Sequence, residues 1–223
     1  MARVFIGVGH GGADPGAVSG GFREADINLV VALACKRELE RHGVEVAVSR
    51  ERDENDKLAE EIAECKAFAP DVAVEIHNNA GGGDGFEVYV QSNTHREESR
   101  KLAVVIEKKV LAFGQNSRGI KTRLNESGED YFGWLRQLDC PAVLLEGFFV
   151  DNVKDRADFD SEGKQQALGV AYAQAVLEYL GISLEEEKEP VLYRIRGKIG
   201  EMDVDLQVVD CRAISCVTGG FVV

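Results

Sequence analysis

The chain has 223 residues, of which 26 are Lys or Arg and 39 are Asp or Glu, giving a formal net charge of −13. This negative balance argues against binding to nucleic acid and against electrostatic adhesion to anionic lipid, because both require concentrated positive charge. Hydrophobic residues make up 44% and charged residues 29% of the chain, which is typical of a globular protein with one sizeable core.

Apolar and amphipathic segments alternate over residues 1–182, which we expect to form one domain. The spacing of apolar residues predicts, in chain order, strand 3–8, helix 24–42, strand 44–48, helix 56–69, strands 71–76 and 86–90, helix 97–113, strand 142–145 and helix 164–180. Strands that alternate with helices predict an α/β fold whose twisted, mostly parallel sheet is flanked by helices.

The composition changes after Gly181. Residues 183–190, SLEEEKEP, are expected to be a short acidic linker, and residues 191–223 are rich in β-branched residues. This C-terminal segment predicts two or three strands as a small β-rich appendage. A segment below about 40 residues rarely forms its own core, so we expect it to dock on the main domain, to pair with a second copy as a homodimer, or to belong to a larger module.

The cysteines and the N-terminus bear on where the protein is made. The five cysteines are odd in number and contain no CxxC pair, so we expect reduced thiols rather than a disulfide framework: Cys35, Cys65, Cys140, Cys211 and Cys216. The N-terminal apolar run is soon interrupted by Gly and His, which is atypical of a signal peptide. No stretch approaches the roughly 18 apolar residues of a membrane span. We therefore expect synthesis in the cytoplasm and no membrane association.

Four side chains fall at one edge of the predicted sheet. His10 follows the first strand, His77 and Glu146 are expected to close two later strands, and Glu24 lies near the start of the first helix. Open α/β sheets bind ligands at the carboxyl edge of their strands. Two imidazoles and two carboxylates there match a catalytic zinc site, in which three ligands hold the ion and a further carboxylate transfers protons.

Structural explanations compete with this hypothesis. Glu24 can simply favour the positive end of the helix dipole, and Asn78 and Asn79, which follow His77, can be turn formers. Glu146 is harder to explain in this way, because four apolar residues precede it and a buried carboxylate needs a partner.

The other two histidines are weaker candidates for metal binding. His42 is expected at a helix C-terminus, where a cation complements the dipole, and His95 is expected to be exposed.

A glycine pattern near the N-terminus imitates a dinucleotide-binding motif. Gly7, Gly9 and Gly12 spell GxGxxG directly after the first strand. The motif requires a helix to begin there so that its N-terminus meets the pyrophosphate. The following residues, ADPGAVSGG, are incompatible with a helix, and no acidic residue ends the second strand, so we reject this interpretation.

Several blocks together resemble a known family. They are GHGGADPGAVSGGFREADINLVVALACKRELERHGVEVAVSR, DVAVEIHNNA, GFEVYV, RGIK and PAVLLEGFFVDN, in that order over nearly all of residues 3 to 181. They resemble the zinc-dependent N-acetylmuramoyl-L-alanine amidases of the amidase-3 type, which form the catalytic domains of phage endolysins and bacterial autolysins.

The resemblance implies hydrolysis of the amide between the lactyl group of N-acetylmuramic acid and the L-alanine of the stem peptide in bacterial peptidoglycan. It assigns His10, Glu24 and His77 as ligands of one Zn²⁺ per chain. Glu146 matches the family's catalytic glutamate, which acts first as general base toward a zinc-activated water and then as general acid.

Two residues depart from the family pattern, which leaves the substrate preference open. Glu75 and Asp151 stand where the family more often has Ser, and neither is expected to touch a metal ligand. Asn78 and Asn79 are expected to contact the substrate.

Two other functions remain open at this point. A non-catalytic peptidoglycan-binding module would be expected to lose a ligand or the glutamate, and all four residues are present. A zinc hydrolase of another amide would differ only in its product. Without a leader, the protein would resemble an endolysin that is released to the cell wall. A bacterial autolysin whose leader was removed fits the sequence equally well. The C-terminal segment is expected to bind a wall polymer or to mediate dimerisation.

Overall fold

The computed structural model describes residues 1–93, 95–184, 191–199 and 202–209. The chain divides into two compact units, Met1–Leu184 and Glu185–Val223.

A six-stranded sheet forms the centre of the first unit. Its strands are β1 (Arg3–Val8), β4 (Glu45–Val48), β5 (Val72–Asn79), β6 (Phe86–Val90), β7 (Ser117–Lys121) and β8 (Ala142–Phe149). They lie in the order β4-β1-β5-β8-β6-β7. All neighbours are parallel except β6 and β8, which are antiparallel. The predicted α/β fold with a mostly parallel sheet is confirmed.

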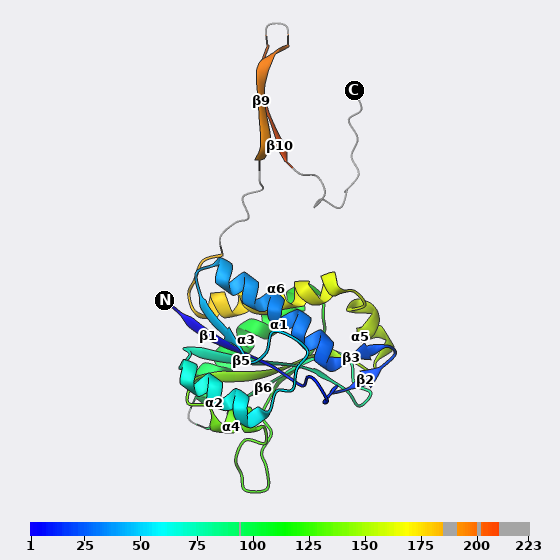
Figure 1. The fold of residues 1–223 in the computed structure, drawn as a ribbon, viewed down its shortest axis with the longest axis vertical. Helices are drawn as coiled ribbons and strands as arrows, with labels where there is room; N and C mark the ends of the chain where they lie inside the picture. The colour runs from blue at the N-terminus through cyan, green and yellow to red at the C-terminus, as the bar shows by residue number, and fades with distance from the viewer. Residues whose placement is uncertain (94, 185–190, 200–201, 210–223) are drawn as a thin grey trace. The chain divides into compact units, whose positions relative to one another are not determined.

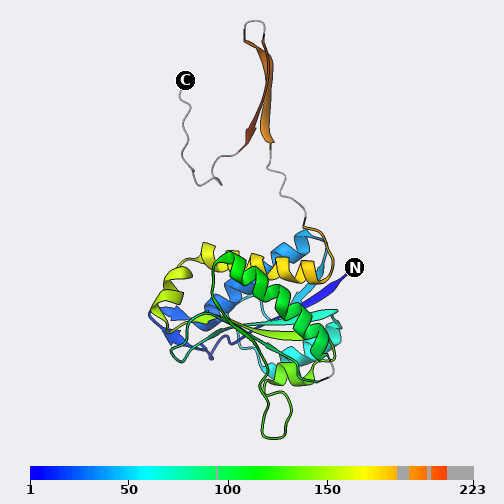
Figure 2. The ribbon, with the colours of Figure 1, turned by 180° about the vertical axis from the view of Figure 1, so that it is seen from behind.

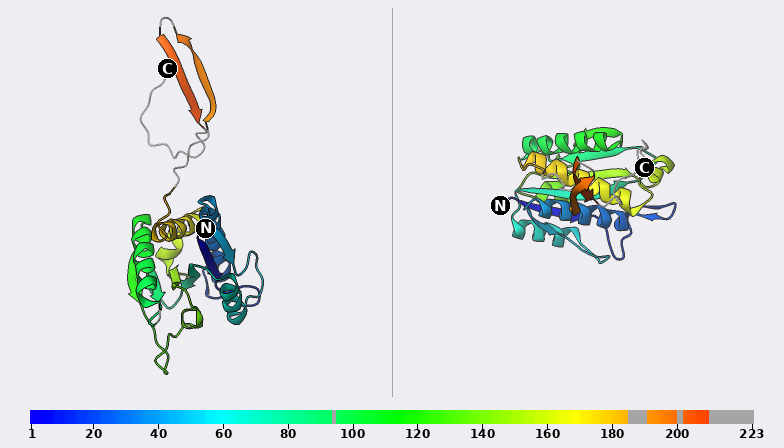
Figure 3. Two further views of the ribbon diagram at one scale, coloured as in Figure 1. Left: turned by 90° about the vertical axis from the view of Figure 1, so that its left-hand side faces the viewer. Right: turned by 90° about the horizontal axis from the view of Figure 1, so that it is seen from above.

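Helices cover both faces of this sheet. One face carries α1 (Glu24–Arg41), α3 (Arg96–Phe113) and α6 (Glu162–Tyr179), and the other carries α2 (Leu58–Phe68) and α4 (Gly133–Gln137) (Figure 1). Figure 2 shows α3 from behind, and the right-hand view of Figure 3 shows α3, α6 and α1 side by side. Each helical layer closes its own apolar cluster against the sheet, so the unit has a core on both faces.

Helix α1 shows how the sequence fixes these elements. Acidic residues occupy its first turn and Arg41 its last, as the helix dipole favours. Its core face repeats every four residues through Ile27, Val31, Cys35 and Leu39, all buried. Gly43 follows with a φ of 75°, the left-handed conformation that ends many helices. The helix therefore begins and ends where the sequence predicts, apart from its final residue.

Two strands run beyond their predicted ends, which corrects the expected position of two site residues. Strand β5 continues past residue 76 to Asn79 and β8 past residue 145 to Phe149, because the two remain paired up to Asn79 and Phe149. His77 and Glu146 thus lie within strands rather than closing them.

Four short features were not predicted from the sequence. They are β7, α4, α5 (Val153–Asp158) and a hairpin formed by β2 (Val18–Ser19) and β3 (Phe22–Arg23). Each spans six residues or fewer, so an apolar period cannot develop.

The second unit contains an antiparallel pair, β9 (Val191–Ile199) and β10 (Met202–Val209), with an irregularity between Val208 and Val209. Two predicted strands of the C-terminal segment are thus present. Residues 185–190 of the expected linker and 210–223 of the appendage lie outside the described residues.

Within the described part of the chain, no helix is long and apolar enough to cross a membrane.

Candidate metal centre

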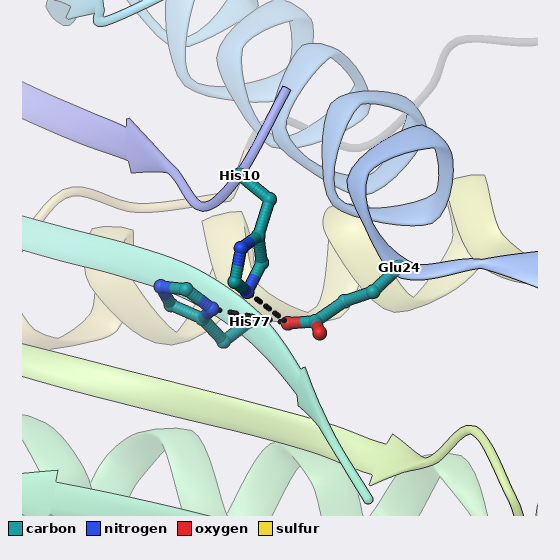
Figure 4. Close-up of side chains that lie close together, drawn as sticks. All are labelled: His10, Glu24 and His77. Carbon is teal, nitrogen blue, oxygen red and sulfur yellow. Dashed lines mark hydrogen bonds and ion pairs between the residues drawn. The ribbon is translucent and has the colours of Figure 1, made fainter. Parts of the chain in front are cut away.

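Three predicted metal ligands converge at the carboxyl edge of the sheet (Figure 4). His10 comes from the loop after β1, Glu24 from the first residue of α1, and His77 from β5. One candidate ligand atom from each residue lies within 4.8 Å of the others. Glu24 Oε1 is 3.3 Å from His10 Nε2 and 3.0 Å from His77 Nδ1. The two imidazole rings meet edge to face, with centroids 4.9 Å apart.

Glycines make this convergence sterically possible. A Cβ atom on Gly9 would lie 2.2 Å from Cε1 of His77. A Cβ atom on Gly16 would lie 2.6 Å from both Glu24 Oε2 and His10 Cδ2, and Gly16 has a φ of 62°. The glycine-rich stretch after β1 therefore provides room for the ligands and left-handed backbone geometry.

The loop that carries His10 is held in place by buried polar side chains. His10 itself has a φ of 62°, which is uncommon for a residue other than glycine. The Arg50 guanidinium donates to the carbonyls of Val8 and Gly9 at 3.1 and 3.2 Å, and it is 2% exposed. Asn28 of α1 donates to the same Gly9 carbonyl at 3.0 Å. These bonds compensate for the unusual backbone and fix the position of the imidazole.

Glu24 is poised to act as an anion. Burial alone would raise its pKa, but hydrogen bonds from His10 and His77 outweigh burial and hold the pKa of the carboxyl far below its usual value. Backbone amides of Ala17 and Asn78 donate to its two oxygens at 2.8 and 3.0 Å. A carboxylate fixed in this way is ready to bind a cation without reorganising.

The imidazoles carry the complementary shift. The hydrogen bond to Glu24 raises the pKa of His10. Burial lowers the pKa of His77, but its hydrogen bonds to Glu24 and Glu75 outweigh burial and hold it well above the usual value. Both rings therefore favour a proton where a metal ligand would need to be neutral, so protons and a metal ion compete for this site.

The outward nitrogen of each ring is also held by a carboxylate. Asp14 Oδ2 lies 2.9 Å from His10 Nδ1, and Glu75 Oε1 lies 3.2 Å from His77 Nε2. The expectation that Glu75 touches no metal ligand is wrong, because residues 75 and 77 of a strand share one face. Carboxylate partners of this kind orient metal-binding histidines and increase their basicity.

Glu146 lies beside the three ligands on the neighbouring strand. The register pairs it with His77 on one side and with Glu87 of β6 on the other. Its Oε2 is buried and has no hydrogen-bond partner among the described residues. Burial is the main cause that raises the pKa of Glu146 to about 7. This group can therefore take up and return a proton near neutral pH.

The two asparagines after His77 have different surroundings. Asn78 is 4% exposed, and its amide donates to Asn28 at 2.8 Å, so it supports the loop and Glu24 from behind. Asn79 is partly exposed and donates to Glu87 at 3.3 Å. Contact of either residue with substrate stays a prediction.

The other residues that the sequence singled out lie apart from the ligands. His42 ends α1, where its Nδ1 lies 2.9 Å from the carbonyl of Glu38. His95 precedes α3. Asp151, the second departure from the family pattern, accepts hydrogen bonds from Gly81 and Gly82 at 2.8 Å.

A pocket of about 260 Å³ opens beside the candidate metal centre; we call it the edge pocket. Two ligands and Glu146 line it, together with acidic residues and apolar walls: Val8, Gly9, His10, Asp14, Asp56, Leu58, Glu61, Glu75, His77, Phe132, Gly133, Trp134, Leu144 and Glu146. Sequence reasoning missed Asp56, Glu61 and Trp134. They come from a loop, from α2 and from α4, and only the fold brings these segments next to β1 and β5.

A second charged cluster borders Glu146 and was also missed. Glu87 is 3% exposed, and its Oε1 lies 2.5 Å from Arg118 Nε and from Lys121 Nζ. The two cations come from β7, the edge strand that the apolar pattern did not reveal. They hold the pKa of Glu87 below its usual value, although burial opposes them.

Comparison with known proteins connects this geometry to a family. The sequence profile of the amidase-3 family, N-acetylmuramoyl-L-alanine amidase, matches residues 4–178. The chain belongs to this family. The match contains the four site residues and the sheet apart from Arg3, the first residue of β1.

Curated relatives and solved structures agree with this assignment. N-acetylmuramoyl-L-alanine amidase CwlM of Bacillus licheniformis is 30% identical over 198 residues, which cover 88% of this chain and 74% of that protein. The endolysin of Bacillus phage SPP1 is 30% identical over 186 residues, covering 80% of this chain and 66% of the endolysin.

Among solved structures, the catalytic domain of CwlV, an N-acetylmuramoyl-L-alanine amidase from Bacillus (Paenibacillus) polymyxa var. colistinus, superimposes with a TM-score of 0.73 at 31% identity. The match covers 82% of this chain and 100% of that domain. Cwp6 from Clostridium difficile gives a TM-score of 0.78 at 33% identity, covering 80% of this chain and 29% of Cwp6.

Proposed function

We propose that this protein is a zinc-dependent N-acetylmuramoyl-L-alanine amidase that hydrolyses the amide between N-acetylmuramic acid and L-alanine in bacterial peptidoglycan. The observation that carries the proposal is the convergence of His10, Glu24 and His77 beside Glu146 in one pocket. Membership of the amidase family supports the substrate and the bond that is cleaved.

The donor set fits zinc. Two imidazole nitrogens and one carboxylate oxygen form a ligand set of catalytic zinc sites, which leave a further position open. The buried, ionised Glu24 supplies charge, and Asp14 and Glu75 hold the outward nitrogens of the histidines. When bound, zinc would polarise the amide carbonyl and increase the acidity of a water molecule.

Glu146 supplies the proton transfers. Its unpartnered Oε2 can accept a proton from the attacking water. The pKa of about 7 lets the same carboxyl give that proton to the departing alanine nitrogen. An amine is a poor leaving group until it is protonated, so the reaction needs this second transfer. Glu146 is therefore assigned as general base and then as general acid.

The test uses the purified protein on isolated peptidoglycan, with a chelator whose effect is reversed by zinc. Newly exposed amino termini are labelled and identified. We expect free L-alanine amino groups that appear only with zinc. New termini of another kind would favour a different amide, and no termini on several wall types despite one bound zinc per chain would overturn the proposal. Binding to walls without cleavage would support the non-catalytic alternative.

The proposal extends to the place of action and to the C-terminal segment. An amidase of peptidoglycan acts on the bacterial cell wall, where its substrate lies. For residues 191–223 we propose wall binding or pairing with a second copy. Comparing the oligomeric state and wall binding of the full chain with those of a truncation after Gly181 tests both roles.

A further inference from the structure

Buried polar atoms without partners gather in the edge pocket. Nine such side-chain atoms occur among the described residues, and five of them belong to residues that line this pocket: Asp56 Oδ2, Glu61 Oε1, Glu75 Oε2, Trp134 Nε1 and Glu146 Oε2. A buried polar atom without a hydrogen bond destabilises the fold, so the concentration of such atoms in one pocket indicates a surface that binds a ligand. Glu146 serves the proposed reaction and Glu75 holds His77 through its other oxygen, whereas Asp56, Glu61 and Trp134 have no part in it.

Three of these residues form what we call the acidic subsite: Asp56, Glu61 and Glu75. Glu61 and Glu75 are each 4% exposed. They meet over β1 at Gly7, where a Cβ atom would lie 2.5 Å from Glu61 Oε1 and 3.1 Å from Glu75 Cγ. The glycine thus leaves space for a carboxylate that α2 directs into the pocket.

The cationic groups near the acidic subsite are held by other partners. Arg50 acts on Asp56 but donates to the carbonyls of Val8 and Gly9, and His77 acts on Glu61 but pairs with Glu24. Among the described residues, Lys57 of the neighbouring turn pairs with Glu60 rather than with Glu61. Glu75 pairs with the metal ligand His77 through Oε1, which leaves Oε2 free. The nearby hydroxyl of Ser49 hydrogen-bonds to Asp56 and Glu61, but a single hydroxyl has one proton to donate. Burial and the neighbouring carboxylates Glu75 and Asp56 hold the pKa of Glu61 well above its usual value, so a cation bound here would favour its ionised form.

The spacing and the walls favour an organic cation over a second metal ion. Among the described residues, the ligand atoms of His10, Glu24 and His77 lie close enough to share a metal ion, whereas those of the acidic subsite do not. An ammonium group has three N–H donors and reaches several carboxylates at hydrogen-bond length. Leu58, Phe132 and Leu144 provide apolar walls for the attached carbon chain, and the free indole N–H of Trp134 can donate to a peptide carbonyl.

We propose that the acidic subsite binds a primary ammonium group of the stem peptide. This inference rests on the proposed function, because it assigns part of the substrate to the edge pocket. Two ammonium groups share this chemistry: the side chain of a diamino acid in the stem peptide, and the α-amino group that L-alanine gains on release. In the first case the subsite selects stem peptides that carry a diamino acid, and in the second it holds the released peptide.

Calorimetric binding of a tripeptide to the zinc-loaded protein tests the inference. The probe is L-Ala-D-Glu-L-Lys, compared with the same peptide acetylated only on the lysine side chain or only on the alanine nitrogen. Loss of a charge-assisted hydrogen bond should weaken binding by about tenfold or more. Weakening by lysine acetylation assigns the side-chain ammonium, and weakening by alanine acetylation assigns the α-ammonium. Equal affinities, or no binding at millimolar concentrations, overturn the proposal.

A matched pair of variants locates the site. Glu61→Gln keeps the shape of the side chain and removes its charge, so it should abolish the preference for the free ammonium. Glu64→Gln, an exposed position one turn further along α2, should preserve the preference. A preference that survives Glu61→Gln and Asp56→Asn would place the ammonium elsewhere and overturn the assignment. The peptide comparison on the unaltered protein stands even if a variant fails to fold.

The outcome can be separated from the fate of the proposed function. Peptidoglycan digestion that yields no new alanine termini, together with ammonium-dependent binding, would contradict the amidase and retain the acidic subsite. Zinc-dependent release of alanine termini, with equal affinity for all three peptides, would retain the amidase and contradict the subsite.

Discussion

The two halves of the edge pocket differ in how their polar groups are satisfied. In the metal-binding half, Glu24 Oε1 bonds both histidines, and their outward nitrogens contact Asp14 and Glu75. In the acidic half, Asp56, Glu61 and Glu75 each keep a buried oxygen without a partner.

The two halves are therefore prepared for different ligands. Partners around the metal-binding half fix the ligands before any ion arrives, which lowers the cost of ordering them on binding. The free oxygens of the acidic half carry a cost that only a bound donor relieves. Substitutions in and beside the metal-binding half test how it is prepared, in order of decreasing effect.

Replacement of Glu24 by Gln should abolish the metal-binding half. The variant loses the negative charge that faces both imidazoles and one of the three ligands. We expect zinc affinity to fall by more than the roughly 100-fold that outer partners of metal ligands contribute, and zinc-dependent activity to fall to background. Equilibrium dialysis against zinc measures this. Glu40→Gln, exposed on the same helix, is the matched control, and normal zinc content in Glu24→Gln would contradict the assignment.

Replacement of Glu146 by Gln should separate catalysis from metal binding. The amide cannot accept the proton from water, so we expect kcat to fall by about 10²–10⁴-fold. Zinc should remain at one ion per chain, because Glu146 is not among the three ligands. Activity on peptidoglycan and metal content are measured on the same preparation. A variant that retains more than a tenth of the activity would remove Glu146 from its assigned role.

The outer carboxylates should have smaller effects on zinc affinity. Asp14→Asn removes the charge that faces His10 Nδ1, and Glu75→Gln does the same for His77 Nε2. Outer partners contribute about 10–100-fold in metal affinity. We expect the buried Glu75 to approach the upper value and Asp14, whose side chain is 68% exposed, the lower one. Equal affinity in all three proteins would show that neither carboxylate orients its ring.

Burial of Glu146 should appear as pH-dependent stability in the zinc-free protein. Its pKa is raised from 4.5 to about 7, so between these values the folded state holds a proton that the unfolded state releases. The free energy of unfolding therefore decreases as pH rises through this window. We expect Glu146→Gln to be more stable than the unaltered protein by about 1–3 kcal/mol at pH 8.

This stability difference should disappear below pH 4.5, where the carboxyl is protonated in both states. Urea unfolding at several pH values measures it. A difference that is constant with pH would mean that Glu146 keeps its ordinary pKa.

Local pattern was sufficient to predict the long elements of the fold. Helices α1, α3 and α6 have 18 residues each, enough for an apolar period to emerge, and β1, β4 and β6 are short apolar runs. Strand β7 escaped prediction because SRGIK carries two cations and a glycine and lies at the sheet edge, where less apolar surface is needed.

The site was predictable only in part. The positions of polar residues next to apolar strands, together with the family resemblance, were enough to locate the site residues His10, Glu24, His77 and Glu146. The contact of Glu75 with His77 was accessible from the alternation of side chains along a strand. The roles of Arg50 and Glu61 depend on the packing of distant segments, which no local pattern contains.

X-ray absorption at the zinc edge tests whether His10, Glu24 and His77 hold zinc. For protein loaded with one zinc per chain, the account predicts nitrogen and oxygen neighbours only, at about 2.0–2.2 Å, and loss of this spectrum in Glu24→Gln. Sulfur neighbours at about 2.3 Å, or a spectrum that Glu24→Gln leaves unchanged, would contradict it.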